Sequence, residues 1–255
     1  PAPTPAGGPF GYLSGSYLFE DVVHGWRLFD VPGDVTTSKE SFDDGYAIQG
    51  RLGYRWDDWD MAIGGQYADF GEGGVSSAPG FEEQATIGAD MWHVDAQAGY
   101  NLMLGDTALR AALGVRYAEW HHTVDAGALG GLTHDWWGVG PRLEVNTDTP
   151  LAESLSLLFD AGAGILFGEI ETEPRRGWTC LDCSDETTTS LNADVRLGLG
   201  WTIAPGATLV AGYQAQYWDS VNVESSDTTG QGDNAGDSDH LIHGPFGSFN
   251  FDLGK

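Results

Sequence analysis

The feature that most constrains this chain is an alternation of apolar and polar residues in segments about ten residues long. In MWHVDAQAGYNLM (91–103), every second residue from Trp92 to Leu102 is apolar or aromatic, and the residues between them are polar or glycine. Successive side chains of a β-strand point to opposite faces, so this pattern predicts strands with one apolar and one polar face. Helical spacing is nearly absent, and we therefore predict an all-β protein.

The same alternation predicts about ten strands: 10–20, 45–56, 59–70, 91–103, 109–117, 136–146, 154–168, 189–201, 207–218 and 240–253. Connections at 57–58, 104–106, 147–153 and 202–206 are short, while those at 21–44, 71–89, 119–135, 169–188 and 219–239 are long and polar. Such asymmetry is typical of bacterial outer-membrane barrels, whose periplasmic turns are short. We predict a transmembrane antiparallel up-and-down β-barrel of about ten strands, with eight or twelve as alternatives. It would form one domain over residues 1–255, with both termini periplasmic.

Charge and composition exclude one class of function and one class of membrane protein. The 255 residues carry a formal net charge of −27, which excludes nucleic-acid binding by phosphate neutralisation. No apolar run reaches 18 residues, which excludes a transmembrane helix. With 12% aromatic residues and 38 glycines, the chain can bury a large apolar area in strands.

Charge decides which face of the strands meets lipid. Six of the nine arginines lie on predicted strands, each on the polar side of its alternation, and four acidic residues share that side. A soluble sandwich or lipocalin-like barrel is the alternative, but the smooth apolar face favours a barrel with lipid outside. The predicted lumen-lining residues are Arg51, Arg55, Asp95, Arg110, Arg116, Arg142, Glu144, Asp160, Asp194 and Arg196.

Aromatic residues stand at both ends of the apolar faces, as in the girdles of membrane barrels. We expect Trp56, Trp59 and Trp201 near the periplasmic rim, and Tyr67, Trp92, Tyr117, Trp137 and Tyr217 near the outer rim.

Three segments resemble the Legionella-type major outer-membrane protein family: WWGVGPRLEVN (136–146), YQAQYWDSVNV (213–223) and HGPFGSF (243–249), with weaker likeness at GYLSGSYLF (11–19). The resemblance implies a pore-forming outer-membrane β-barrel with cysteine-linked assemblies, and it brings no catalytic residues. The end of the chain departs from the usual pattern, because Lys255 follows Phe251 where barrel chains commonly end on an aromatic residue. The boundary of the last strand is therefore open.

Two functions follow from mixed charges in a lumen of about ten strands, which is little wider than side chains can fill. The charges could line an ion path, with Gly138, Gly140, Gly162, Gly164, Gly198 and Gly200 leaving space between them, or they could form a buried ion-pair network. The first predicts a porin-like protein with limited passage of small solutes or ions. The second predicts a structural or surface-contact barrel with a plugged lumen and functional acidic external loops.

The two cysteines, Cys180 and Cys183, lie three residues apart in a polar loop. A local disulfide is the preferred interpretation, with linkage between chains next; zinc is weakly supported because no second such pair follows.

Acidic loops suggest a cation role, although we expect no tightly bound cofactor or metal. The stretch DTTGQGDNAGDSD (227–239) lacks the register of a calcium-binding EF-hand, so Ca²⁺ would at most bridge the carboxylates weakly to anionic glycolipid. Expected partners are outer-membrane lipid, lipopolysaccharide and either a second copy or a surface partner at the external loops.

Two groups of Asp and His residues could in principle support catalysis, but a protein without enzymatic activity is the preferred interpretation. Asp237, Asp239, His240 and His243 stand together in the sequence, as do Asp90, His93 and Asp95, and an Asp/His set could activate water. Rim histidines are the simpler interpretation because no nucleophile or metal motif accompanies them. We therefore expect no enzyme.

Overall fold

The computed structural model describes residues 7–22, 44–74, 86–125, 131–175, 186–221 and 239–254, and these fold into ten strands. No helix long and apolar enough to cross a membrane occurs among them. The strands are β1 (Gly8–Val22), β2 (Gly45–Trp56), β3 (Trp59–Gly74), β4 (Thr86–Leu104), β5 (Thr107–Asp125), β6 (Gly131–Ala152), β7 (Leu155–Arg175), β8 (Glu186–Ala204), β9 (Ala207–Trp218) and β10 (His240–Asp252).

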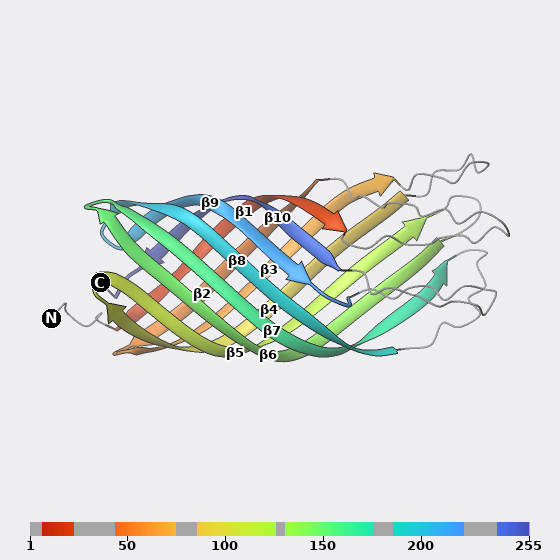
Figure 1. Cartoon of the computed structure of the whole chain (residues 1–255), viewed down its shortest axis with the longest axis horizontal. Coiled ribbons are helices and arrows are strands. Elements are labelled where there is room, and N and C mark those ends of the chain that lie inside the picture. The colour runs from red at the N-terminus through yellow and green to blue at the C-terminus, as the bar shows by residue number, and fades with distance from the viewer. Residues whose placement is uncertain are drawn as a thin grey trace.

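Each strand pairs antiparallel with its neighbours in the sequence, and β1 pairs with β10 to close the barrel (Figure 1). The closing register matches Phe10 with Asp252 and Val22 with His240. The beginning of β1 and the end of β10 therefore lie at the same end as the four short turns. This confirms the predicted up-and-down barrel of ten strands.

The strands are unequal in length, and here the predicted boundaries were wrong. Strands β4 to β8 have 19 to 22 residues, whereas β2, β9 and β10 have 12 or 13. Much of the predicted loops 119–135 and 169–188 is strand, and the predicted turn 147–153 belongs mostly to β6. Outward polar residues such as Glu119 and Glu171 interrupt the apolar alternation there, but the backbone hydrogen-bond ladder continues regardless of side-chain polarity.

The barrel is apolar outside and polar inside along most of its length. Leu13, Ile63 and Leu143 are each more than 60% exposed, whereas Arg116 and His93 are each 2% exposed. This is the reverse of a soluble barrel and fits a protein whose outer solvent is lipid. The last strand ends at Asp252, one residue past Phe251.

Candidate functional site

All ten predicted lumen residues face the barrel interior, and ion pairs join most of them. We call the central set the charge belt; its members are Arg51, Asp60, Asp95, Arg110, Arg116, Arg142, Glu144 and Asp194. Ion pairs cross the lumen between non-adjacent strands, for example from Arg51 on β2 to Glu144 on β6, whose Nη2 and Oε1 atoms are 2.5 Å apart. These contacts tie opposite walls together.

The upper half of the belt is a group of two arginines and two aspartates. Arg116 donates from Nε and Nη2 to both carboxylate oxygens of Asp95, at 2.7 and 2.8 Å, and its Nη1 lies 3.4 Å from Asp194. Arg142 contacts Asp194 at 2.7 Å and lies 3.9 Å from Asp95. Each aspartate is thus shared by two guanidinium groups, which offsets the cost of burying the four charges.

The lower half centres on Arg110. Its Nε and Nη2 donate to Asp60 at 2.8 to 3.0 Å, and its Nη1 donates to Gln97 at 3.2 Å and to Asn146 at 3.0 Å. Asp60 was missed by the sequence analysis although its side chain is fully buried. Its position on the polar side of segment 59–70, directly after a short turn, was the available signal.

The other three predicted lumen residues lie outside the charge belt. Arg196 sits 4.2 Å over the Phe246 ring and 5.0 Å over Tyr12, and its Nη2 donates to Ser14 at 3.2 Å. Asp160 accepts from Asn146 at 2.9 Å. Arg55 pairs with Asp252 at 2.9 Å near the mouth.

Large side chains lie next to two of the inward glycines. A Cβ placed on Gly162 would lie 2.1 Å from Nη2 of Arg142, and one on Gly138 would lie 2.6 Å from the Trp136 ring. The space next to these glycines is therefore filled by large neighbouring side chains. A cavity of about 20 Å³ lies beside Tyr12 and Phe246.

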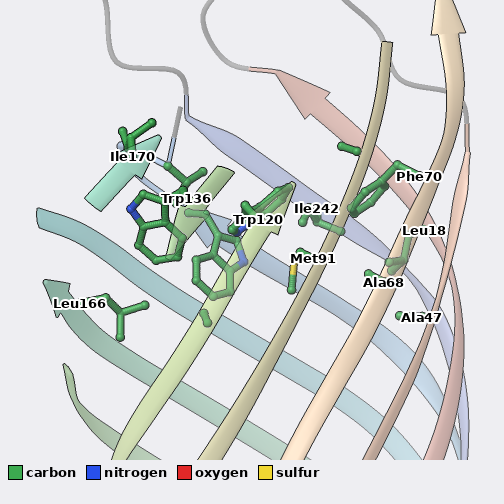
Figure 2. Close-up of a cluster of buried hydrophobic side chains, with 14 residues drawn as sticks. Leu18, Ala47, Ala68, Phe70, Met91, Trp120, Trp136, Leu166, Ile170 and Ile242 are labelled. Carbon is green, nitrogen blue, oxygen red and sulfur yellow. The ribbon is translucent and has the colours of Figure 1, made fainter. Parts of the chain in front are cut away.

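Toward the long connections, the interior changes from charged to apolar and aromatic (Figure 2). We call this region the plug: it contains Leu18, Ala47, Ala68, Phe70, Ala89, Met91, Ala118, Trp120, Trp136, Leu166, Ile170, Trp218, Val221 and Ile242, together with His122, His134 and His240. Trp120 packs edge-on against Trp218 with ring centroids 5.8 Å apart, and Trp136 packs likewise at 6.2 Å. Buried side chains thus occupy the lumen at two successive levels, by ion pairing in the charge belt and by apolar packing in the plug.

The predicted girdle residues all project outward. Trp56, Trp59 and Trp201 lie at the end with the short turns, and the other five lie toward the long connections. At the outer girdle, Glu119 accepts hydrogen bonds from Nε1 of Trp92 at 3.0 Å and from the hydroxyl of Tyr117 at 2.5 Å.

Directly above this girdle, the outer face of β4 to β7 carries a groove of about 350 Å³. The strand registers place Asp90, His121, Asp135 and Glu171 in one row across these four strands. Trp92, Glu119 and Trp137 form the next row down, and the inward-facing Trp120 and Trp136 lie between the rows. His121 pairs with Asp135, so three carboxylates of the groove have no ion pair among the described residues.

Several sequence predictions fall outside the described residues or are separated by the fold. Cys180, Cys183 and most of the acidic stretch 227–239 are not described, so the disulfide and the weak Ca²⁺ bridging stay predictions. In the Asp/His set, His93 and Asp95 face the lumen while Asp90 faces outward. Among the described residues, no three His, Cys, Asp or Glu side chains are placed to hold a metal ion.

Comparison with known proteins gives one family. The sequence profile described as Legionella pneumophila major outer membrane protein precursor matches residues 11–253. No curated protein matches the chain. Among solved structures, the chain is similar to the outer membrane protease OmpT from Escherichia coli, with a TM-score of 0.60 and 9% identity over 96% of both chains.

Two further similar structures come from Neisseria. The translocator domain of autotransporter NalP from Neisseria meningitidis has a TM-score of 0.47 at 12% identity, covering 96% of this chain and 88% of that one. Neisserial surface protein A has a TM-score of 0.37 at 12% identity, covering 96% and 97%. At this level of identity the likeness to OmpT establishes the barrel fold alone.

Proposed function

This chain belongs to the Legionella major outer-membrane protein family, and from that premise we propose that it is an outer-membrane barrel closed to solutes at rest, which acts through its outer end. The observation that supports the proposal is that two successive sets of lumen side chains, the charge belt and the plug, are buried. Arg116 in the belt is 2% exposed and Trp218 in the plug is wholly buried. Ten strands leave an interior little wider than side chains can fill, so buried side chains at two levels favour a closed lumen.

The same proposal includes the orientation of the barrel in the outer membrane. The short turns and both ends of the barrel would face the periplasm, and the longer strands β4 to β7 would project on the outside. The apolar outer face of the strands and the two aromatic girdles would contact outer-membrane lipid and lipopolysaccharide, because Trp and Tyr rings favour the headgroup level.

Planar-bilayer recording tests the closure. The protein is first shown to be folded by its heat-dependent gel mobility. This control is needed because unfolded protein would give no current whether or not the lumen is closed. We expect no discrete current steps at neutral pH. Frequent steps of uniform size from the folded protein would contradict a closed resting lumen.

The groove above the outer girdle indicates how the outer end acts. Its carboxylates Asp90, Glu119 and Glu171 are joined by the faces of Trp92 and Trp137, which attract cations. A basic polypeptide segment has the complementary charge and the side-chain length to enter such a groove. We therefore expect this surface to bind a positively charged protein partner.

The affinity of the refolded barrel for a fluorescent lysine-rich peptide tests this expected binding. The variant Asp90→Asn, Glu119→Gln, Glu171→Gln removes the three groove carboxylates named above and should weaken binding at least ~10-fold, because each exposed charge pair contributes up to about 1 kcal/mol. A matched control, Asp57→Asn, Asp106→Asn, Glu153→Gln, removes three carboxylates at the short turns and should leave affinity within about 2-fold. Equal losses would mean that the peptide senses only the net charge of −27.

A second candidate is limited passage of small ions, and the shared ion pairs of the belt favour it. Since Arg116 and Arg142 both contact Asp95 and Asp194, these groups can exchange partners without leaving any charge unpaired. A passing ion could then move between them. If folded wild-type protein conducts, Arg142→Gln should shift the reversal potential under a salt gradient; an unshifted potential would remove Arg142 from the path.

A further inference from the structure

One backbone edge of β8 is open above the point where β9 ends. The ladder between the two strands reaches Asn192, and its last bond runs from the amide of Asp219 to the carbonyl of Leu191 at 2.9 Å. On its other side, β8 stays paired with β7 as far as Glu186. Among the described residues, positions 186–190 therefore extend past β9 as an edge strand (Figure 1).

A turn at Ser220 explains why β9 does not continue beside β8. Ser220 has a φ of 55°, which lies in the left-handed region and cannot extend a strand. The next residue, Val221, is 1% exposed and belongs to the plug. The chain therefore turns into the barrel, and the hydroxyl of Thr188 donates to the Ser220 carbonyl at 3.4 Å.

The backbone groups on the open side of β8 belong to alternate residues. The Leu191 carbonyl faces β9, and in an extended strand the N–H and C=O of every second residue point to the same side. Those of Thr189 and Thr187 thus face the open side, where the part of the chain that the structure describes gives them no backbone partner. Thr188 and Ser190 direct theirs to β7.

The side chains along this edge do not protect it from a further strand. Edge strands are commonly guarded by charged side chains, by proline or by a bulge. Residues 187–191 are Thr-Thr-Thr-Ser-Leu, without charge or proline, and their pairing with β7 runs without a register shift. β-Branched residues also favour the extended conformation. The edge is thus a template for one more strand.

The segment of the chain that follows β9 is a poor candidate for that strand. Residues 222–238 are rich in Gly, Asp and Asn, which are depleted in strands. Their composition argues against a stable ladder with β8.

A second copy of the barrel in the same membrane does not fit the edge either. Strands of such barrels are tilted by about 35–45°. A two-fold rotation about the membrane normal tilts the β8 strand of the copy in the opposite direction. The two edges would therefore cross instead of running side by side.

The outer face beside the edge is acidic. Glu169 on β7 lies opposite Thr187 in the register, and the chain as a whole has a formal net charge of −27. An outward lysine or arginine on an added strand would lie about 10 Å from Glu169, which is two strand spacings and within reach of a long side chain. A basic outward face is therefore complementary to this edge.

We propose that the open edge of β8 binds an extended segment of a partner protein. This segment pairs antiparallel with residues 187–191 as an added strand, and it carries lysine or arginine on its outward face. Its main-chain hydrogen bonds supply affinity, and its alternate side chains supply specificity. The site goes beyond the proposed function, because it uses backbone groups of β8 and none of the groove carboxylates.

Amide hydrogen exchange of the refolded barrel in detergent micelles, resolved by residue with NMR, tests the open edge. In the free protein, Thr187 and Thr189 should exchange at least ~10-fold faster than Thr188 and Ser190, whose amides bond to β7. A short fluorescent peptide of alternating threonine and lysine should then slow exchange at Thr187 and Thr189 and leave Thr188 and Ser190 unchanged.

The affinity of the same peptide separates strand pairing from simple charge attraction. A version that is N-methylated at every amide keeps its charges but cannot donate backbone hydrogen bonds, and it should bind at least ~10-fold more weakly. The variant Thr189→Pro removes one N–H from the open side, where an edge strand tolerates proline. It should also weaken binding of the unmethylated peptide ~10-fold, whereas Thr189→Val keeps the N–H and should stay within about 2-fold.

Four results would overturn the proposal. They are slow exchange of Thr187 and Thr189 in the free protein, which would show that the chain covers its own edge; no slowing by the peptide; equal affinity for the methylated peptide; and unchanged affinity in folded Thr189→Pro. If that variant does not fold, the two peptides on wild-type protein decide. The groove variant Asp90→Asn, Glu119→Gln, Glu171→Gln should keep the slowing at Thr187 and Thr189, so failure of the groove is distinguished from failure of the edge.

Discussion

The charge belt and the plug occupy the same lumen at two levels, and they differ in the interactions that hold their side chains in place. In the belt, every arginine meets a carboxylate at defined angles, as Arg116 does with both oxygens of Asp95. In the plug, rings and methyl groups fill space, and the indole N–H groups find no acceptor. Loss of one member leaves an unpaired charge in the belt but only a void in the plug.

The largest effect should come from the belt. Arg116→Ala leaves Asp95 buried with only the distant Arg142 guanidinium, so we expect the free energy of unfolding to fall by about 3 to 5 kcal/mol. Urea titration of the barrel in lipid vesicles measures it. Arg55→Ala, whose pair with Asp252 is 13% and 18% exposed, should lose clearly less. Similar losses in both variants would show that burial does not set the strength of the belt.

A deletion in the plug should cost slightly less. Leu166→Ala removes a fully buried side chain and leaves a cavity, for which about 3 kcal/mol is expected in the same titration. Leu253→Ala, 68% exposed beyond the end of β10, should change stability by less than about 0.5 kcal/mol. A loss below ~1 kcal/mol for Leu166→Ala would mean that the plug collapses around the void and is not tightly packed.

A glycine in the belt sharpens the comparison without removing any charge. In Gly162→Ala the new methyl group would meet the Arg142 guanidinium, which must leave its place between Glu144 and Asp194. We expect a loss of about 1 to 3 kcal/mol, measured by urea unfolding. Gly15→Ala adds a methyl group that meets nothing within 4 Å on the lipid side, and it should be nearly neutral. If Gly162→Ala leaves the free energy of unfolding unchanged, the Arg142 guanidinium can move aside without loss of stability.

The smallest effect should come from the boundary between the two regions. Gln66 and Gln216 exchange amide hydrogen bonds across the lumen, at 2.6 and 3.4 Å. A double-mutant cycle with Gln66→Ala and Gln216→Ala should give a coupling energy of about 1 kcal/mol. Additive losses would indicate that this pair contributes packing alone.

Much of the fold could be predicted from residues that alternate without interruption. Segment 91–103 fixes its own strand, its two faces and the inward position of Asp95, because any strand presents alternate side chains to opposite sides. The upper parts of β5 and β7 could not be predicted. Their outward faces carry Glu119, His121 and Glu171, which resemble loop residues because that part of the barrel lies beyond the apolar outer face of the strands.

The candidate site divides in the same way. The inward arginines and carboxylates could be predicted from their side of the alternation, but their partners could not. Arg51 meets Glu144, which stands 93 positions further along the chain (144 − 51), and this pairing is set by the shear and closure of ten strands. The plug histidines were interpreted as rim residues, since His122 and His240 meet only across the lumen of the closed barrel, where β5 and β10 are opposite strands.

The sequence by itself determined that this chain forms a lipid-facing barrel with a charged interior, because a period of two and the side on which arginines fall are local properties. Only the tertiary structure decided which charges pair with one another inside the barrel, and that histidines and tryptophans are buried together above them. These depend on how far apart opposite walls stand. That distance is a property of the closed barrel and of no single strand.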